Sequence, residues 1–315
     1  MQGASDVEIV GFTHNDTAVY YQTRNKNGKP ETTLKRVALA GAGRGAPEEL
    51  ARSGRSDSLV VAGSFVYWIA PRADLSANDL VRLPKTGGRP EVIAHATDYP
   101  MRHLTADDAV NVYFANFTTR LGAGAAKIVR IAPDRTRTVL VTDGEGDAWS
   151  FAVAEDVTFW TPSPQAGHGA VFSDALIYAR ESDGRASRVI YGPVPESYVN
   201  ALAVDETKIF FARQHGVFEM PRGGGSPTTI AEDDASEVVL DHGTLYWLTR
   251  GEYVGTSAGV VPRKAGTIVR SGRSRGAGQV VTDDLVCPRH FEVDRWTLFV
   301  DSRVGNVSII IRVGK

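Results

Sequence analysis

The sequence predicts an all-β fold, a seven-bladed β-propeller built from four-stranded antiparallel meanders. Three observations predict it. An aromatic pair recurs along the chain, alternating apolar runs keep step with that pair, and no long stretch has the 3.6-residue apolar period of a helix. A unit of four short strands cannot bury its own faces, so successive units must cover one another. Radial packing of such units leaves only short, protected sheet edges.

A pair of aromatic or apolar residues marks the second strand of each unit. The pairs lie at residues 20–21, 67–68, 113–114, 159–160, 210–211, 246–247 and 299–300. Their intervals, roughly 36 to 53 residues, surround the period of about 40–50 expected for propeller blades. We therefore expect one domain over residues 1–315, with blades at about 6–52, 53–97, 98–145, 146–193, 194–232, 233–283 and 284–315. No fourth strand follows the last pair. This leaves three alternatives: a seventh blade of three strands, a fourth strand supplied by natural N-terminal residues that this sequence lacks, or a six-bladed propeller with an extra strand pair.

Three further runs in each unit predict the other strands. An alternating run before the pair is strand A, as in NALAVDET at 200–207. A run that often carries an arginine follows the pair and is strand C, as in DLVRLPK at 79–85. A short run after a Gly- or Arg-rich turn is strand D, as in RPEVIA at 89–94. Period-2 alternation, β-branched and aromatic residues, and Gly, Pro or Asp at the ends are typical of strands.

The pattern VYW…LVRLPKTGG.PEVIA, within residues 66–94, resembles the Tyr-Trp propeller repeats of many bacterial extracytoplasmic proteins. It is more distantly similar to the YWTD repeats of lipoprotein-receptor propellers. The Thr-Asp part of YWTD is absent, because Ile69, Thr161 and Leu248 follow the pair in three of the units. In general architecture the chain also resembles virginiamycin B lyase. That resemblance implies a histidine and a carboxylate-bound metal on one face, and the Tyr-Trp repeats imply an extracytoplasmic or secreted location. Propellers of this breadth have many functions, so the resemblance predicts the fold.

Composition excludes several classes of function. The formal charge of -2 gives no reason to expect nucleic acid or an anionic membrane as a partner. The single cysteine, Cys287, excludes an intramolecular disulfide and a thiolate cluster for zinc. No apolar run is long enough to span a membrane, and residues 1–10 do not have the pattern of a signal peptide. We expect a monomer.

The predicted topology brings the start of strand A, the B–C connection and the end of strand D to one face, at the mouth of the central channel. Aligning the A strands on their aromatic pairs, with one extra residue allowed in the third blade, gives two levels of residues at that face. The inner level comprises Gly11, Ser58, His103, Ser150, Ala201, Glu237 and His290. The outer level comprises Val10, Asp57, Arg102, Trp149, Asn200, Ser236 and Arg289.

The inner level supplies the candidate catalytic residues. His103, Glu237 and His290 combine two imidazoles with a carboxylate, a set that serves general acid–base chemistry or binds a divalent metal ion. A divalent metal is accordingly the one cofactor that we consider. The alternative is that these ionisable residues lie at a solvated channel mouth by chance and have no function there.

The outer level supplies candidate substrate-binding residues. Arg102 and Arg289 suit a carboxylate or a phosphate. Asp57, Trp149 and Asn200 belong to the same level, and Tyr253 lies in a long B–C connection, residues 250–266. Two other long connections, at 116–127 and 162–174, share the face, and the second contains His168 and Phe172. Loops of this length are often functional, although a tolerated insertion is an equal alternative.

Three classes of function remain. The first is a propeller that binds a small-molecule or protein ligand at this face. The alternative is an enzyme, a hydrolase, lyase or cyclase, that uses His103, Glu237 and His290 with or without metal. An assembly scaffold that binds through the outer D-strand edges is the third.

Overall fold

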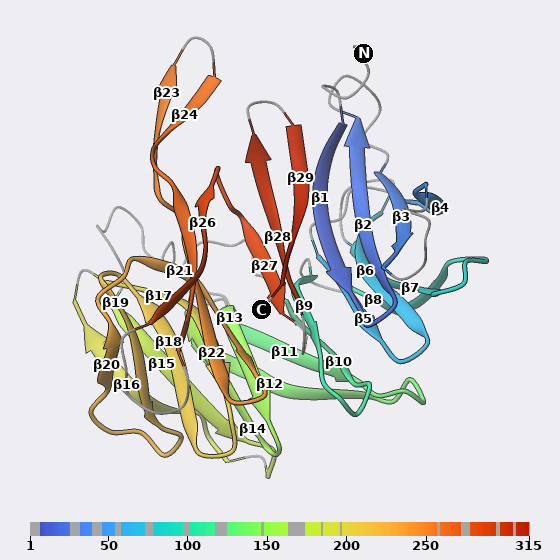
Figure 1. Cartoon of the computed structure of the whole chain (residues 1–315). Coiled ribbons are helices and arrows are strands. Elements are labelled where there is room, and N and C mark those ends of the chain that lie inside the picture. Colours follow the sequence, from blue (N-terminus) through green and yellow to red (C-terminus); the bar gives the residue numbers. More distant parts are fainter. Residues whose placement is uncertain are drawn as a thin grey trace. The chain divides into compact units, whose positions relative to one another are not determined.

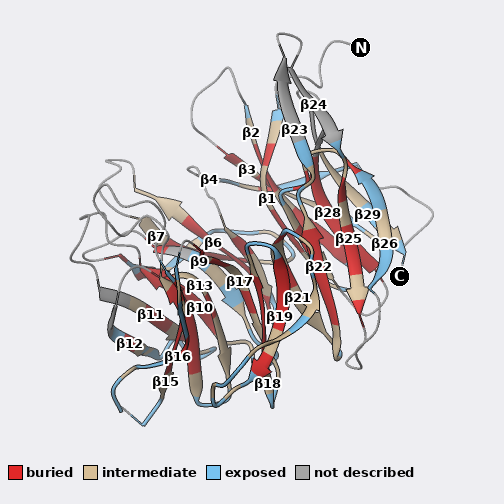
Figure 2. Cartoon of the chain, turned by 90° about the vertical axis from the view of Figure 1, so that its left-hand side faces the viewer, coloured by how far each residue is buried: buried red, intermediate tan, exposed pale blue. Residues whose placement is uncertain are grey.

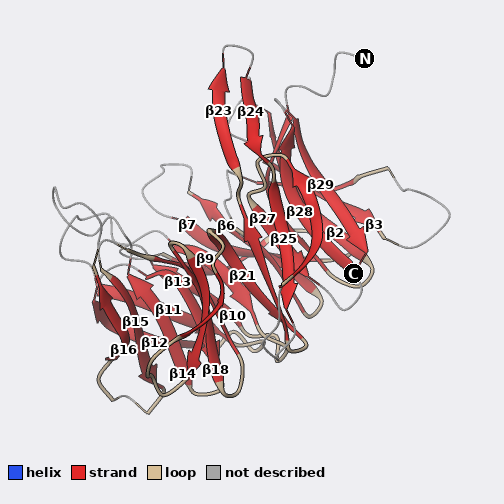
Figure 3. Ribbon diagram, turned by 60° about the vertical axis from the view of Figure 1, so that its left-hand side comes forward, coloured by secondary structure: helices blue, strands red, loops and turns tan. Residues whose placement is uncertain are grey.

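The computed structural model describes residues 7–25, 32–39, 46–53, 58–72, 78–96, 101–116, 125–145, 148–162, 174–183, 185–195, 197–256, 259–271, 278–293, 297–304 and 307–314. This part of the chain contains strands and no helix (Figure 3). In the described part of the chain, seven antiparallel sheets of three or four strands follow one another, so the fold is the predicted all-β, seven-bladed β-propeller, and the six-bladed alternative is wrong. A helix that could cross a membrane is absent from the described residues.

The chain divides into two compact units. The first comprises residues 1–117, 128–139 and 306–309, and the second comprises residues 118–127, 140–305 and 310–315. The first two blades lie within the first unit, and blades four, five and six lie within the second (Figure 1). The third and seventh blades contribute residues to both units.

Each of the first three blades is a four-stranded meander in which neighbours along the chain are hydrogen-bonded. Blade one consists of β1 (Val7–His14), β2 (Ala18–Asn25), β3 (Thr32–Ala38) and β4 (Glu48–Ser53). Blade two consists of β5 (Leu59–Ala62), β6 (Phe65–Pro71), β7 (Asn78–Pro84) and β8 (Glu91–His95). Blade three consists of β9 (Met101–Ala106), β10 (Val112–Asn116), β11 (Ala125–Ile131) and β12 (Arg137–Glu145).

The next three blades repeat the meander. Blade four consists of β13 (Ala148–Ala154), β14 (Val157–Pro162), β15 (Ala175–Glu181) and β16 (Arg188–Val194). Blade five consists of β17 (Val199–Val204), β18 (Lys208–Arg213), β19 (Gly216–Pro221) and β20 (Thr228–Ala231). Blade six consists of β21 (Ala235–Asp241), β22 (Thr244–Thr249), β25 (Gly266–Ser271) and β26 (Gln279–Leu285).

Blades six and seven depart from the regular pattern. Between β22 and β25, blade six carries a separate two-stranded hairpin, β23 (Glu252–Thr256) and β24 (Gly259–Lys264), which extends beyond the sheet (Figure 1). Blade seven has three strands in the described part of the chain: β27 (His290–Val293), β28 (Thr297–Val304) and β29 (Val307–Gly314). The described part of the last blade thus has three of the four strands predicted for each unit.

The aromatic pair recurs because each blade has two neighbours to cover. Successive residues of a strand point to opposite faces of the sheet. Tyr67 accordingly packs in a cluster with blade three, and Trp68 packs in a cluster with blade one. In blade six, Tyr246 packs with blade seven and Trp247 with blade five. Figure 2 shows the buried residues running along the strands. The repeated pair is thus the main source of apolar burial between blades.

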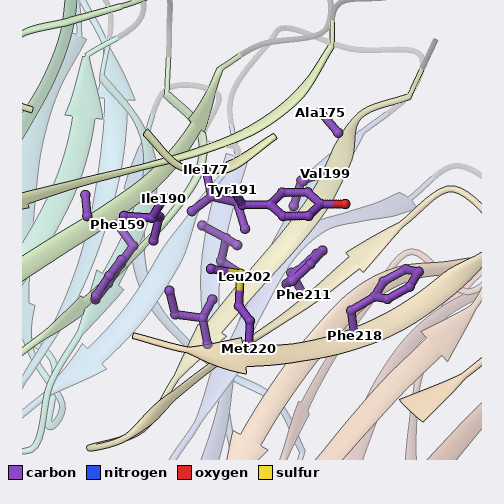
Figure 4. Close-up of a cluster of buried hydrophobic side chains, with 12 residues drawn as sticks. Phe159, Ala175, Ile177, Ile190, Tyr191, Val199, Leu202, Phe211, Phe218 and Met220 are labelled. Carbon is purple, nitrogen blue, oxygen red and sulfur yellow. The ribbon is translucent and has the colours of Figure 1, made fainter. Parts of the chain in front are cut away.

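The contact between blades four and five illustrates this packing (Figure 4). Phe159 and Ile177 of blade four share a buried cluster with Leu202 and Phe211 of blade five. Tyr191 lies against Phe211, with ring centroids 4.9 Å apart. Truncating a buried aromatic such as Phe211 removes about 3–5 kcal/mol in typical cores, so the wedge between blades is a major part of the stability.

The arginine of strand C has a structural role across three strands. In blade two, Arg82 lies opposite Tyr67 of strand B and Glu91 of strand D. Its guanidinium stacks 4.3 Å from the centroid of Phe65 and lies 2.9 Å from the Glu91 carboxylate. Arg36 in blade one pairs in the same way with Glu48. The repeated arginine therefore ties strands B, C and D together on one face.

Candidate functional site

The outer level of predicted residues coincides with a repeated β-bulge at the start of strand A. The register of β1, β13, β17 and β21 against strand B shifts by one residue. The bulge residues, which this shift leaves out of the strand register, are Val10, Trp149, Asn200 and Ser236. A bulge re-aims a side chain and ends regular pairing, and bulges are common beside binding sites. The outer level is therefore structurally distinct from the rest of the strand.

In the third blade, the predicted alignment is wrong by one residue. Thr105 pairs with Tyr113 and Arg102 pairs with Ala115, so His103 and Leu104 both lie opposite Phe114. Arg102, rather than His103, occupies the inner level there. His103 is exposed and has a positive φ of 52°, which few residues other than glycine adopt. In this blade the bulge lies directly beside Leu104, one residue closer to the middle of strand A than the bulges of the other blades. The spacing of apolar residues does not reveal this difference.

Three inner-level side chains bond one blade to the next. The Oγ of Ser58 accepts a hydrogen bond from the backbone amide of Leu104 at 3.0 Å. The Oγ of Ser150 accepts one from Leu202 at 3.2 Å. In blade six, Oε2 of Glu237 accepts one from Phe291 at 3.1 Å. Each acceptor is at the equivalent position of blade two, four or six, and each donor is the core residue of the following strand A. These polar side chains therefore hold neighbouring A strands together.

The predicted pair Glu237 and His290 is brought together. His290 Nδ1 lies 2.5 Å from Oε1 of Glu237, and Nε2 lies 3.6 Å from Oε1 of Glu292. Desolvation is the largest single influence and lowers the pKa of His290. The attraction of both carboxylates and their hydrogen bonds outweigh it, so the pKa of His290 lies well above 6.5. At neutral pH the ring is thus an imidazolium that donates to Glu237, while 43 % of its side chain stays exposed.

The contacts of this pair bear on the predicted metal site. Tetrahedral zinc ligands at about 2.0–2.2 Å from the metal lie more than about 3 Å from one another, and Nδ1 and Oε1 are 2.5 Å apart. In the part of the chain that the structure describes, no group of three or more His, Cys, Asp or Glu side chains is arranged to hold a metal ion. His103 belongs to the first unit, and Glu237 and His290 to the second. The metal and catalytic roles of the three residues stay predictions.

Arg289 from the outer level has a partner within its own blade. Its guanidinium lies 2.9 Å from Oδ2 and 3.0 Å from Oδ1 of Asp301 on β28. The Asp301 side chain is only 7 % exposed, so a cation is needed beside it. A ligand carboxylate or phosphate would have to compete with this buried aspartate for Arg289.

A pocket of about 440 Å³ lies at the predicted face of blades five and six. Its walls come from the segments that the topology was expected to bring together: the starts of β17 and β21, the β18–β19 turn, the β20–β21 connection, the end of β22 and the base of the β23–β24 hairpin. The lining residues are Tyr198, Asn200, Gln214, His215, Glu232, Asp233, Asp234, Ala235, Ser236, Thr249, Arg250, Gly251, Glu252 and Lys264. Asn200 and Ser236, two of the bulge residues, are among them.

Several lining residues are fixed by contacts of their own. Asn200 Nδ2 donates to the carbonyl of Ala235 at 2.9 Å and so links the two bulges. Asp233 accepts a hydrogen bond from the indole of the buried Trp247 at 2.8 Å. Asp234 accepts one from the backbone amide of His215 at 2.9 Å. These bonds orient the walls of the pocket.

Some predicted residues cannot be placed. Asp57, His168 and Phe172 lie outside the described residues, and the structure gives the backbone but not the side chain of Arg102 and Tyr253. Trp149 is half-buried at the bulge of blade four. Most pocket residues were not predicted. The acidic run at 232–234, directly before strand A of blade six, was the available indication, because it lies on the face already chosen.

Comparison with known proteins gives the fold and no family. No family model matches the chain, and no curated protein matches it. Among solved structures, it is similar to an oligogalacturonate lyase from Vibrio parahaemolyticus, with 8% identity, a TM-score of 0.70, and coverage of 99% of this chain and 91% of that one. It is also similar to the propeller domain of the Trilobed protease from Pyrococcus furiosus, with 11% identity, a TM-score of 0.67, and coverage of 98% and 94%.

The chain is also similar in fold to the tricorn protease, which is a longer protein. Its identity is 12% and its TM-score 0.67, and the match covers all of this chain but only 34% of that one. The chain thus spans about a third of the tricorn protease. At such identities the likeness shows the propeller fold alone. The resemblance to Tyr-Trp repeat proteins and to virginiamycin B lyase stays a prediction.

Proposed function

We propose that this chain is a ligand-binding β-propeller whose binding site is the pocket between blades five and six. The pocket itself is the observation that carries the proposal. Its volume of about 440 Å³ lies within the range of about 300–1,000 Å³ typical of small-molecule sites. It opens on the face where the bulges interrupt regular strand pairing, and its walls are formed by strand ends and turns.

The chemistry of the lining supports a polar ligand. The walls carry an amide from Asn200, a second amide from Gln214, a hydroxyl from Tyr198 and several charged groups. A few convergent polar groups are what fix a ligand's orientation in such a site. An apolar partner would leave these groups without hydrogen bonds, at a cost of about 1–3 kcal/mol each when buried.

The enzyme alternative is less well supported by the contacts of its residues. Glu237 makes the same kind of interblade bond as Ser58 and Ser150, so a structural role accounts for it. An imidazolium held by two carboxylates is a poor general base at neutral pH. The enzyme proposal would regain support if turnover or metal uptake were found and were lost in a His103→Ala/His290→Ala variant.

A blocked pocket tests the binding proposal. Ser236 is half-buried in the wall, and Ser236→Trp should fill the cavity without removing an aromatic core residue. We expect some member of a panel of small amines, amino acids, short peptides, carboxylates and sugars to raise the melting temperature of the wild-type protein. The same compound should have no effect on Ser236→Trp.

The matched control places the same side chain elsewhere. Glu206 is exposed in the A–B turn of blade five and does not line the pocket, so Glu206→Trp should respond to the ligand like wild type. Circular dichroism establishes that both variants fold. The proposal fails if no compound binds, or if the blocked variant binds as well as the control.

A further inference from the structure

The pocket contains side chains of both charge signs. Glu232, Glu252, Arg250 and Lys264 all line it. Among the described residues, none of the four forms an ion pair or a side-chain hydrogen bond. Glu252 and Lys264 even lie directly opposite each other at the base of the hairpin. Both signs of charge thus remain available to a third group.

Some cross-strand charges of opposite sign elsewhere in the described part of the chain are paired. Glu8 and Arg24 are opposite each other and lie 2.7 Å apart. Lys208 and Glu219 lie 2.9 Å apart across β18 and β19. Cross-strand neighbours are within easy reach of one another, and pairing stabilises them modestly. Among the described residues, the charges at the pocket therefore differ from these ion pairs, and Lys35 and Glu49 likewise lie opposite each other without forming one.

The neutral groups of the pocket match the polar atoms of a peptide bond. Asn200 uses its Nδ2 to bind the Ala235 carbonyl, which leaves Oδ1 as an acceptor. Gln214 offers both a donor and an acceptor, and the Tyr198 hydroxyl offers either. Amide N–H and C=O groups are complementary to this set.

We propose that the ligand is a zwitterionic short peptide, an inference that rests on the proposed function. Its ammonium group binds at Glu232 and Glu252, its carboxylate binds at Arg250 and Lys264, and its peptide groups bind Asn200, Gln214 and Tyr198. A ligand with charge of one sign only meets unpaired charges of its own sign in the same pocket. A zwitterion is attracted by both sets, and charge-assisted hydrogen bonds are stronger than neutral ones.

Capped peptides test the two charges separately. The probe is trialanine, compared by calorimetry with N-acetyl-trialanine, which lacks the ammonium, and with trialanine amide, which lacks the carboxylate. We expect each cap to weaken binding to the wild-type protein by about tenfold, the size of effect typical of losing one charge-assisted hydrogen bond. All binding should be lost in Ser236→Trp.

Charge variants assign each end of the peptide. In Glu232→Gln/Glu252→Gln, trialanine should bind as weakly as the acetylated peptide binds wild type, and acetylation should have little further effect. In Arg250→Gln/Lys264→Gln, amidation should have little further effect. These side chains are exposed, so folding should be unaffected. Glu206→Gln, outside the pocket, is the matched control and should bind like wild type.

Several results would overturn the inference. Failure of trialanine to bind, or equal binding of the capped peptides, would exclude a zwitterionic peptide. Tighter binding of 1,4-diaminobutane than of trialanine would identify a dicationic ligand instead. If another compound binds wild type but not Ser236→Trp, only this inference fails and the proposed function stands. If no compound of the panel binds, the proposed function fails as well.

Discussion

The Oε2 atom of Glu237 accepts a hydrogen bond from the backbone amide of Phe291 at 3.1 Å. The same carboxylate holds the ring of His290 through Oε1. One side chain of blade six thus fixes both the backbone and a side chain at the start of blade seven. Phe291 is fully buried, so its amide would otherwise lack an acceptor beside an apolar core. Glu237, which the sequence suggests as a catalytic residue, therefore also forms a structural hydrogen bond between blades.

Removing this carboxylate should destabilise the protein. Glu237→Ala leaves the buried amide of Phe291 without its acceptor, and we expect a loss of about 1–3 kcal/mol in the free energy of unfolding. Glu237→Gln keeps an oxygen acceptor and should lose less. Chemical denaturation measures both. Glu206→Ala, an exposed control, should change stability by no more than about 0.5 kcal/mol. Equal stability of Glu237→Ala and wild type would contradict the interblade role.

Stability should fall as the pH rises above neutrality. The pKa of His290 is raised in the folded protein, above the value of about 6.5 expected in the unfolded chain. Its contribution is therefore fully present below pH 6.5 and is lost as the pH rises through the folded-state pKa. Glu237→Gln/Glu292→Gln should flatten this part of the profile. An NMR titration midpoint of the His290 ring at or below 6.5 would refute the assignment.

A serine at Gly11 should stabilise the first blade. Gly11 occupies the level of Ser58 and Ser150, and a Cβ built there meets no atom within 4 Å. The serine hydroxyl would lie where Ser58 and Ser150 bond the next strand A, and replacing glycine also reduces the entropy of the unfolded chain. We expect Gly11→Ser to gain about 0.5–1 kcal/mol.

The control for this gain is another glycine of strand conformation. A Cβ at Gly216 would lie 2.6 Å from the ring of Phe218, so Gly216→Ser should destabilise. Thermal unfolding compares the two variants. A lower melting temperature for Gly11→Ser than for wild type would show that the open space beside Gly11 is needed.

The ion pair between Arg82 and Glu91 should make the stability of the second blade depend on pH in the acid range. The hydrogen bond from Arg82 is the main reason why the pKa of Glu91 lies below its ordinary value. The ion pair's contribution is present above the unfolded pKa of about 4.3 and is lost as the pH falls through the lowered folded pKa. Arg82→Met should raise the pKa of Glu91, which carboxyl NMR measures, and should reduce stability at neutral pH.

An exposed pair provides the comparison for Arg82. Arg52 and Glu49 lie 2.9 Å apart, but 72 % of the Arg52 side chain is exposed. Arg52→Met should therefore change stability by less than about 1 kcal/mol. Equal effects of the two substitutions would argue against the three-strand role of the buried arginine.

Much of the fold follows from periodicity. The pair at Tyr67 and Trp68 indicates a strand with two buried faces, and its repetition indicates how many such strands must cover one another. The positions of bulges do not follow, because a bulge depends on how two strands fit after they pair. His103 shows the difference, since one shifted bulge moves Arg102 to the inner level instead.

Only part of the candidate site could likewise be predicted from the sequence. Asn200 and Ser236 were predicted to lie at the binding face, because topology alone places the starts of the A strands there. The base of the hairpin, at Glu252 and Lys264, also lines the pocket. The sequence did not reveal this contribution, because these residues are far from Asn200 along the chain.

By itself, the sequence determined the all-β class, the number of blades and the strand order. Each of these depends on residue spacing, which the linear pattern records directly. Only the tertiary structure decided that Glu237 binds a neighbouring backbone amide, that Arg289 is paired with Asp301, and that the pocket lies between blades five and six. Those facts depend on distances between side chains of different strands, which are set by packing.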